Sequence, residues 1–253
     1  MAVELYAFTC GYVTVPAGWL LAGAKGQMTV PVCAYLVIHP KGRVLFDTGL
    51  HVATQTDQVG YIGAAFHAYE QCHFQAGEEI SERLRQMQID PRSIDYVVNS
   101  HLHFDHCGGN GLLPNAAIVS QRREFDYANS GEGGPGYIKN DWDTGQSFKL
   151  IEGEHDLFGD GAVVILPTHG HTPGHQSLRV RTERGGEFVL CGDACYLKDN
   201  LDQLRLPGIV ADRGATLAVL ERFREMQQRG STIVFGHDPE QWKSIPQGPA
   251  RLG

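Results

Sequence analysis

Four side chains with metal-ligand chemistry fall within six consecutive positions, directly after a run typical of a β-strand. The four are His101, His103, Asp105 and His106, and the expected strand is Tyr96–Asn99. Residues i and i+2 of an extended chain point the same way, so His101 and His103 can bind one ion together. Asp105 and His106 open the following turn, where the backbone changes direction. The spacing predicts two adjacent metal ions, because this cluster without metal would suffer desolvation and mutual repulsion.

Short strands and a few helices are expected around this cluster. Helical periodicity predicts helices over Glu78–Gln88, Gln121–Ala128 and Gly214–Gln228. Runs rich in Val, Ile, Leu and aromatic residues predict the strands Val3–Phe8, Val32–Ile38, Val44–Asp47, Tyr96–Asn99, Ala116–Ser120, Val163–Pro167, Ser177–Val180, Phe188–Cys191 and Ile233–Phe235. This mixture, without a Pro- or Ser-rich linker, favours a single α/β domain over residues 1–253.

A glycine-rich stretch, Gly131–Gly136, formally matches the dinucleotide-binding pattern G-x-G-x-x-G. It follows an expected helix instead of a strand, contains a proline and lacks a βαβ unit after it. We therefore expect a flexible surface loop here and no dinucleotide.

The overall composition argues against several classes of partner. The chain has 253 residues, with Lys+Arg 21 against Asp+Glu 29 and a net charge of -8, which disfavours nucleic acid or an anionic membrane as a partner. The longest apolar stretch, Val32–Ile38, is too short to span a bilayer, so no membrane insertion is expected. Without a signal-peptide pattern, and with six scattered cysteines, a cytoplasmic location is expected. The oligomeric state stays open between monomer and homodimer.

The His-x-His-x-Asp-His motif resembles the signature of the metallo-β-lactamase superfamily. Further segments are similar to the other motifs of that superfamily, in the same order: Phe46–Gly49, Gly170–His175, Gly192–Asp193 and Gly236–His237. The resemblance runs over nearly the whole chain. It implies an αββα sandwich with a dinuclear metal site at one edge of its sheets.

The same resemblance implies two metal ions per chain and a set of ligands. It assigns His101, His103 and His171 to the first metal, Asp105, His106 and His237 to the second, and Asp193 with a hydroxide as the bridge between them. Such ligands suit Zn²⁺, although Fe, Mn or Co would also fit. Asp47 is expected to orient a ligand histidine.

Within the superfamily, the chain is most similar to the N-acyl homoserine lactonases of the quorum-quenching type. The segments that carry this likeness are His101–Asn110, Gly174–Leu178, Asp193–Tyr196 and Phe235–Gln241. The resemblance implies that the bridging hydroxide attacks the lactone carbonyl and that Tyr196 polarises the carbonyl oxygen. It also implies that Asp105 passes the proton to the leaving alkoxide.

The substrate is less well defined by the sequence than the metal site. Apolar residues in Tyr12–Met28 and Tyr61–Phe74 could line a channel for an acyl chain, or could be ordinary core. Phe104 is expected to face the same cavity. The alternatives are a lactonase for a different ring, a glyoxalase-II-like thioesterase or a β-lactamase. A mono-iron dioxygenase and a non-catalytic metal-binding module are less favoured.

Other residues near the motifs are expected to have structural roles. His175 is predicted to make structural hydrogen bonds, while His169 could lie near the site or simply pack at the surface. Cys191 and Cys195 are predicted to be small buried hydrophobes that do not bind metal.

Overall fold

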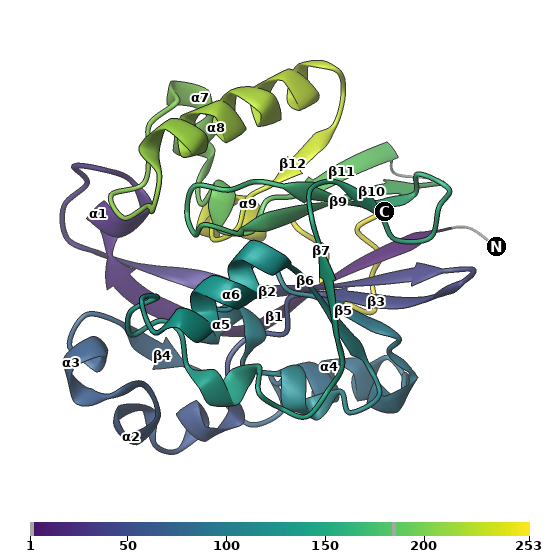
Figure 1. Ribbon diagram of the computed structural model, residues 1–253, viewed down its shortest axis with the longest axis horizontal. Coiled ribbons are helices and arrows are strands. Elements are labelled where there is room, and N and C mark those ends of the chain that lie inside the picture. The colour runs from purple at the N-terminus through teal and green to yellow at the C-terminus, as the bar shows by residue number, and fades with distance from the viewer. Residues whose placement is uncertain (1–2, 184–185) are drawn as a thin grey trace.

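Two β-sheets face each other in the computed structural model, which describes residues 3–183 and 186–253 (Figure 1). The first sheet has the strand order β4 (Gln71–His73), β1 (Glu4–Pro16), β2 (Gln27–His39), β3 (Gly42–Phe46), β5 (Tyr96–Val98), β6 (Ala117–Gln121) and β7 (Phe148–Ile151). The second has the order β12 (Thr232–Val234), β11 (Gly186–Leu190), β10 (Gln176–Thr182), β9 (Val163–Pro167) and β8 (His155–Asp156).

Helices alternate with these strands along the chain. The α-helices are α1 (Ala17–Leu20), α2 (Gln58–Ile62), α3 (Ala64–His67), α4 (Ile80–Gln86), α5 (Phe104–Cys107), α6 (Arg122–Ser130), α7 (Lys198–Gln203), α8 (Arg213–Gln228) and α9 (Pro239–Trp242). Single 3₁₀ turns occupy Val52–Gln55, Pro91–Ser93, Asn110–Leu112, Lys139–Asp141 and Gly192–Ala194. Among the described residues, no helix is both long enough and apolar enough to cross a bilayer.

The first sheet has an apolar core on each of its faces. In β1, Leu5 points into the core between the sheets, whereas Tyr6 points to the outer face. The outer face is covered by α4, whose Ile80 and Leu84 are completely buried. This is the two-residue alternation of a strand that is covered on both sides.

The second sheet is covered on its outer side by α8. Leu220 and Phe223 of this helix are completely buried against Val189 and Ile233 of the sheet. Burying a side chain of this size contributes roughly 1.5–3 kcal/mol. Helix, two sheets and helix form the αββα layering that the sequence analysis expected (Figure 1).

Strand direction explains where functional side chains can gather. The strands β3, β5 and β6 run parallel in the first sheet, and β11 and β12 run parallel in the second. The segments that carry the predicted ligands follow the ends of β5, β9, β11 and β12. The two sheets therefore contribute loops to one shared edge.

Candidate metal centre

The predicted ligands form two adjacent clusters of side chains in the structure. Within each cluster, the possible ligand atoms all lie within 4.8 Å of one another. One cluster contains His101, His103, His171 and Asp193, and the other contains Asp105, His106 and His237. The structure thus brings together every residue that the sequence analysis nominated as a ligand, in the expected grouping.

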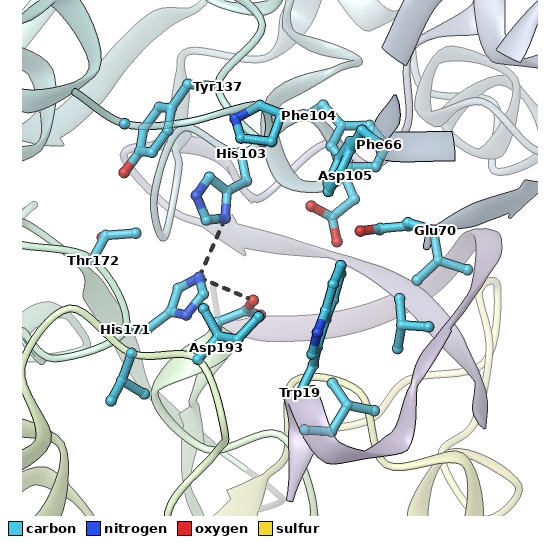
Figure 2. Close-up of a pocket in the computed structure, with 18 of the residues that line it drawn as sticks. Trp19, Phe66, Glu70, His103, Phe104, Asp105, Tyr137, His171, Thr172 and Asp193 are labelled. Atoms are coloured by element: carbon cyan, nitrogen blue, oxygen red, sulfur yellow. Dashed lines mark hydrogen bonds and ion pairs between the residues drawn. The ribbon is translucent and has the colours of Figure 1, made fainter. Parts of the chain in front are cut away.

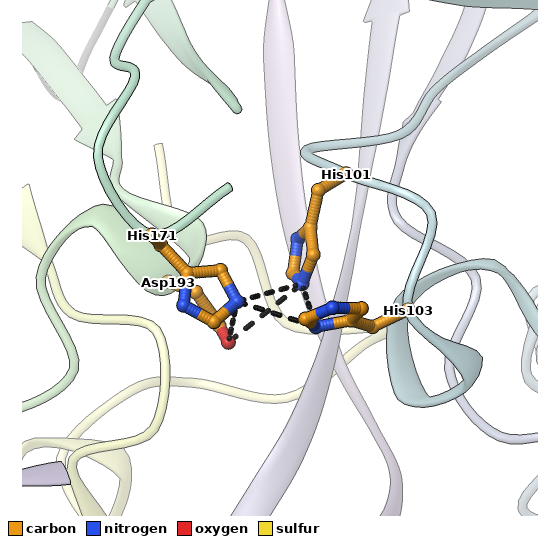
Figure 3. A group of neighbouring side chains, drawn as sticks. All are labelled: His101, His103, His171 and Asp193. Carbon is orange, nitrogen blue, oxygen red and sulfur yellow. Dashed lines mark hydrogen bonds and ion pairs between the residues drawn. The ribbon is translucent and has the colours of Figure 1, made fainter. Parts of the chain in front are cut away.

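Three histidines converge on one point in the first cluster (Figure 3). His101 Nε2 and His103 Nδ1 lie 2.8 Å apart, and His171 Nε2 lies 3.2 Å from each. Burial lowers the pKa of His103 to about 3, and it also lowers the pKa of His101 and of His171. These imidazoles are therefore neutral at pH 7 and can offer their lone pairs to a cation.

Asp193 lies between the two clusters and directs one oxygen toward each. Its Oδ2 is 3.4 Å from His171 Nε2 and 3.8 Å from His101 Nε2. Its Oδ1 is 3.1 Å from Nε2 of both His106 and His237. This Oδ1 is buried and faces the imidazole nitrogens of the second cluster, while Oδ2 faces those of the first. A buried carboxylate with one oxygen toward each group of histidines fits a position that binds cations on both sides.

The histidines of the second cluster lie close to several carboxylates. Asp105 Oδ2 lies 3.4 Å from His106 Nε2 and 3.8 Å from His237 Nε2. Burial disfavours the charged form of His106, but Asp105, Asp193 and Asp47 outweigh it and raise the pKa of this residue well above its usual value. The pKa of His237 is also raised, since Asp193 outweighs burial. Without metal, these histidines hold protons at the place where a cation would bind.

A cavity of about 560 Å³ opens over both clusters (Figure 2). Its walls are mainly apolar and come from β1, α1, the α3 region and α5. The residues Val13, Val15, Trp19, Leu20, Phe66, Tyr69 and Phe104 belong to the lining, and so does Tyr196. Trp19 stacks on Phe66 at 6.4 Å between ring centroids, and Phe66 meets the edge of Phe104 at 5.7 Å. The two segments proposed as channel walls thus line one apolar cavity together with Phe104.

The metallo-β-lactamase superfamily model matches residues 29–237, which is most of the chain and includes both clusters. The chain belongs to this superfamily. The resemblance and the fold class expected from the sequence are thereby confirmed, and the chain is identified as a hydrolase of the superfamily.

Several known members of the superfamily are similar over most of their length. The N-acyl homoserine lactonase AttM of Azorhizobium caulinodans is 36% identical over 235 residues, covering 90% of this chain and 89% of AttM. The lactonase AiiA of Bacillus thuringiensis subsp. kurstaki is 33% identical, covering 86% of this chain and 85% of AiiA. A solved N-acyl homoserine lactone hydrolase, with the product N-hexanoyl-L-homoserine bound at its catalytic metal center, matches with a TM-score of 0.90 at 31% identity, covering 99% of this chain and all of that one.

Two histidines of the second cluster in this metallo-β-lactamase site are held by a partner on the other ring nitrogen. Asp47 Oδ2 lies 2.9 Å from His106 Nδ1, and its Oδ1 accepts a hydrogen bond from the backbone N–H of Ser100 at 2.6 Å. The Nδ1 of His237 lies 2.7 Å from the carbonyl oxygen of Pro31. Such contacts fix which nitrogen faces a metal. Asp47 contacts a candidate ligand in the way that the sequence analysis expected.

Glu124 of α6 was not singled out by the sequence analysis. It links two ligand loops, namely the segment after β5 that carries His101 and His103 and the segment after β9 that carries His171. It is completely buried, and its Oε1 accepts hydrogen bonds from the backbone N–H of Leu102 at 3.1 Å and the Tyr137 hydroxyl at 2.7 Å. Its Oε2 accepts from the Thr172 hydroxyl at 2.6 Å and the Gly174 N–H at 3.1 Å. A single acid on a short helix carries no signal in the sequence that distinguishes such a buried position from a solvated one.

The glycine-rich segment 131–136 forms part of the cavity wall in this superfamily member. Gly133, Pro135 and Gly136 line the cavity, although most of the segment is exposed as expected. The carbonyl of Gly136 accepts a hydrogen bond from the N–H of Phe104 at 2.9 Å. A Cβ at Gly136 would lie 3.1 Å from the ring of His103, so a side chain there would press on a candidate ligand. The surface-loop prediction therefore missed this contact with the site.

The remaining candidates lie outside both clusters. His175 Nε2 accepts a hydrogen bond from the backbone N–H of Asp193 at 3.0 Å, so His175 is a structural hydrogen-bonder next to the bridge position. His169 is partly exposed and its buried Nδ1 lacks a partner among the described residues. Cys191 and Cys195 are completely buried free thiols. The other five histidines of the chain also lie outside the clusters: His39, His51, His67, His73 and His155.

Proposed function

We propose that this protein is a metal-dependent lactonase that hydrolyses the ester ring of N-acyl homoserine lactones. The observation that carries the proposal is the position of Asp193. One of its oxygens faces the first cluster, the other faces the second, and the residue itself lines the apolar cavity. Its similarity to AttM, AiiA and the product-bound hydrolase supplies the substrate class.

Two zinc ions are the cofactors that this donor set suits best, although Fe, Mn or Co would also fit. Histidine nitrogens and carboxylate oxygens around an open position are typical of catalytic zinc. The first ion would be held by His101, His103 and His171, the second by Asp105, His106 and His237, with Asp193 shared. When bound, the ions would supply a Lewis acid and an activated water at neutral pH.

Tyr196 is placed to polarise the carbonyl oxygen of the substrate. Its hydroxyl oxygen lies 3.1 Å from His171 Nδ1. If Nε2 of His171 faces the metal, Nδ1 carries the hydrogen and donates it to the tyrosine oxygen. The hydroxyl hydrogen of Tyr196 is then directed away from His171, toward Asp193 in this structure and toward the carbonyl oxygen once the substrate is bound. Burial, together with Asp193, raises the pKa of Tyr196 well above its usual value, so it stays a donor.

Asp105 is placed to carry the proton that ring opening requires. The bond between the carbonyl carbon and the ring oxygen breaks as a new bond forms from that carbon to a water oxygen. The departing alkoxide must gain the proton that this water loses. Asp105 lines the cavity, and although burial opposes ionisation, His106 outweighs it and lowers the pKa of Asp105. The Asp105 carboxylate can therefore take the proton and pass it to the alkoxide.

The acyl tail is expected to lie against the aromatic wall. Each buried methylene contributes about 0.8 kcal/mol, so kcat/KM should rise with chain length until the cavity is filled. Trp19, Phe66 and Phe104 offer the apolar surface for this contact.

Mass spectrometry of a metal-replete reaction tests the proposed function. N-hexanoyl homoserine lactone should gain one water while its amide stays intact, which separates a lactonase from an acylase. Thioesters, β-lactams and unsubstituted lactones in the same panel should react far more slowly. Efficient opening of other lactones with homoserine lactones untouched, or activity confined to thioesters or β-lactams, would contradict the proposal.

A further inference from the structure

Glu70 is a buried acid in the cavity wall that the mechanism above does not use. It lies between α3 and β4 and is only 6% exposed. It lines the cavity together with Phe66 and Phe104, and its carboxyl group points toward that of Asp105 (Figure 2). An acid in such apolar surroundings is costly unless a hydrogen-bond donor reaches it.

No described residue donates a hydrogen bond to Glu70. Several hydroxyl donors of the lining are engaged elsewhere, since those of Tyr137 and Thr172 donate to Glu124. The hydroxyl of Tyr127 donates to the carbonyl of Glu132. Glu70 belongs to neither metal-ligand cluster, and it is the only acid among the described lining residues of which this is true. It is thus an acceptor that faces the cavity without a donor from the protein.

The proposed substrate carries one N–H donor, and its chemistry fixes where that donor must lie. In an N-acyl homoserine lactone the amide nitrogen is bonded to the ring carbon next to the carbonyl. The N–H is therefore only two covalent bonds from the carbon that is attacked, whereas the acyl tail continues away from the ring. A group that recognises this N–H must lie beside the metal ligands, at the start of the apolar wall. The carboxyl group of Glu70, which lies beside that of Asp105 and near the rings of Phe66 and Trp19, occupies such a position (Figure 2).

We propose that the Glu70 carboxyl group accepts a hydrogen bond from the amide N–H of the substrate and thereby selects acylamino lactones over lactones that lack this donor. The assignment rests on the proposed lactonase function. It does not depend on the protonation state of Glu70, because both the acid and the carboxylate offer an oxygen that accepts from N–H. Glu70 is then a specificity-determining residue that orients the ring over the metal site.

A pair of substrates that differ at one atom tests the role of Glu70. N-hexanoyl homoserine lactone has the N–H, and α-hexanoyloxy-γ-butyrolactone replaces it with an ester oxygen at the same length. Ring opening of each is followed by mass spectrometry for wild type, Glu70→Met and Glu70→Gln. Because the two lactones differ in intrinsic reactivity, the quantity compared is the change in the ratio of their kcat/KM values between variants.

Glu70→Met should lower kcat/KM for the amide substrate by about 10- to 100-fold, because the N–H then meets no acceptor, and should leave the ester substrate nearly unchanged. Glu70→Gln retains an acceptor oxygen and should keep most of the preference. Glu82→Met, which removes an acid on α4 outside the cavity lining, should leave the ratio at its wild-type value. Zinc content should match wild type in all three variants.

Three results would overturn the assignment. An equal loss on both substrates in Glu70→Met and Glu70→Gln would indicate a general catalytic or structural role. A loss of zinc in Glu70→Met would make Glu70 part of the metal site. An unchanged ratio in Glu70→Met would remove it from substrate recognition. Wild-type protein that opens neither lactone would instead contradict the proposed function itself, which distinguishes the two failures.

Discussion

At the scale of single residues, the chemistry of this site depends on which nitrogen of each histidine faces the cluster. His103 presents Nδ1, whereas His101 and His171 present Nε2. The grouping of the candidate ligands could be predicted from the sequence, since their spacing and the family motifs name them. The choice of nitrogen could not, because it is set by partners that are distant in sequence, such as Pro31 for His237.

The hydroxyl of Tyr196 is expected to act on the substrate and not on the metals. Tyr196→Phe should keep its metal content and its contact with the His171 ring, but lower kcat by on the order of 10²-fold, the usual effect of removing an oxyanion donor. Steady-state kinetics with parallel elemental analysis measure both quantities. Wild-type kcat and KM in this variant would leave Tyr196 with a packing role alone.

Metal binding should release protons from the second cluster. The raised pKa of His106 and of His237 means that the metal-free protein holds protons there at neutral pH, whereas the lowered pKa of His103 leaves this histidine of the first cluster uncharged. Zinc affinity should therefore weaken as pH falls, with about one to two protons released per chain on loading. Calorimetry in two buffers of different ionisation enthalpy counts these protons. Zinc binding without proton release at pH 7 would contradict this charge assignment.

At the scale of elements, sequence patterns predicted the long, regular segments and missed the short ones. The helices α4, α6 and α8 and most core strands lie within a few residues of their predicted ranges. The strands β4, β7 and β8 were missed, as were helices of a single turn such as α5. These segments are too short to show a periodicity, and tertiary contacts decide their conformation. The expected strand Val3–Phe8 extends to Pro16, because β1 continues past a register shift between Thr9 and Tyr12 in its pairing with β2.

Helix α6 contributes to the site through Glu124, which is expected to position the first metal cluster. Each carboxylate oxygen of Glu124 accepts hydrogen bonds from two donors. In Glu124→Gln the NH₂ group would replace one of these oxygens and face donors, which should push the two ligand loops apart. Zinc affinity of the first cluster should fall by about 10- to 100-fold, as for other partners behind metal ligands. Titration of zinc into the metal-free variant measures this affinity.

The matched control for this experiment is Asp126→Asn, which removes an exposed acid from the same helix. It should bind zinc as the wild type does. If Glu124→Gln also binds two zinc ions with wild-type affinity, the link between the ligand loops has no role in shaping the metal site.

At the scale of the whole molecule, a hydrogen bond joins α2 to the 3₁₀ turn Lys139–Asp141, although the two are distant in sequence. The Tyr61 hydroxyl of α2 donates to Asp141 Oδ1, close after the glycine-rich segment. The other oxygen of Asp141 is buried without a partner among the described residues. Burial raises the pKa of Asp141 to about 7, and its pKa in the unfolded chain is near 3.8.

The stability of the protein should therefore depend on pH through Asp141. Between the two pKa values the folded state keeps a proton that the unfolded state has lost, so the free energy of unfolding falls as pH rises, and it levels off above about pH 7. Asp141→Asn lacks this titration and retains an oxygen for Tyr61. Relative to wild type, it should gain about 2–3 kcal/mol between pH 5 and pH 8. Urea unfolding of both metal-free proteins at the two pH values measures the difference, and a constant difference would contradict the buried charge.

The sandwich as a whole brings ligands from both sheets to one edge, and the account of function depends on these ligands acting as one paired site. The most direct test adds zinc stepwise to metal-free protein while a weakly buffered indicator follows the proton released by each opening of N-hexanoyl homoserine lactone. Because Asp193 faces both clusters, turnover should rise to a plateau at about two zinc ions per chain. A plateau at one zinc ion, or full turnover by the metal-free protein, would contradict the paired site.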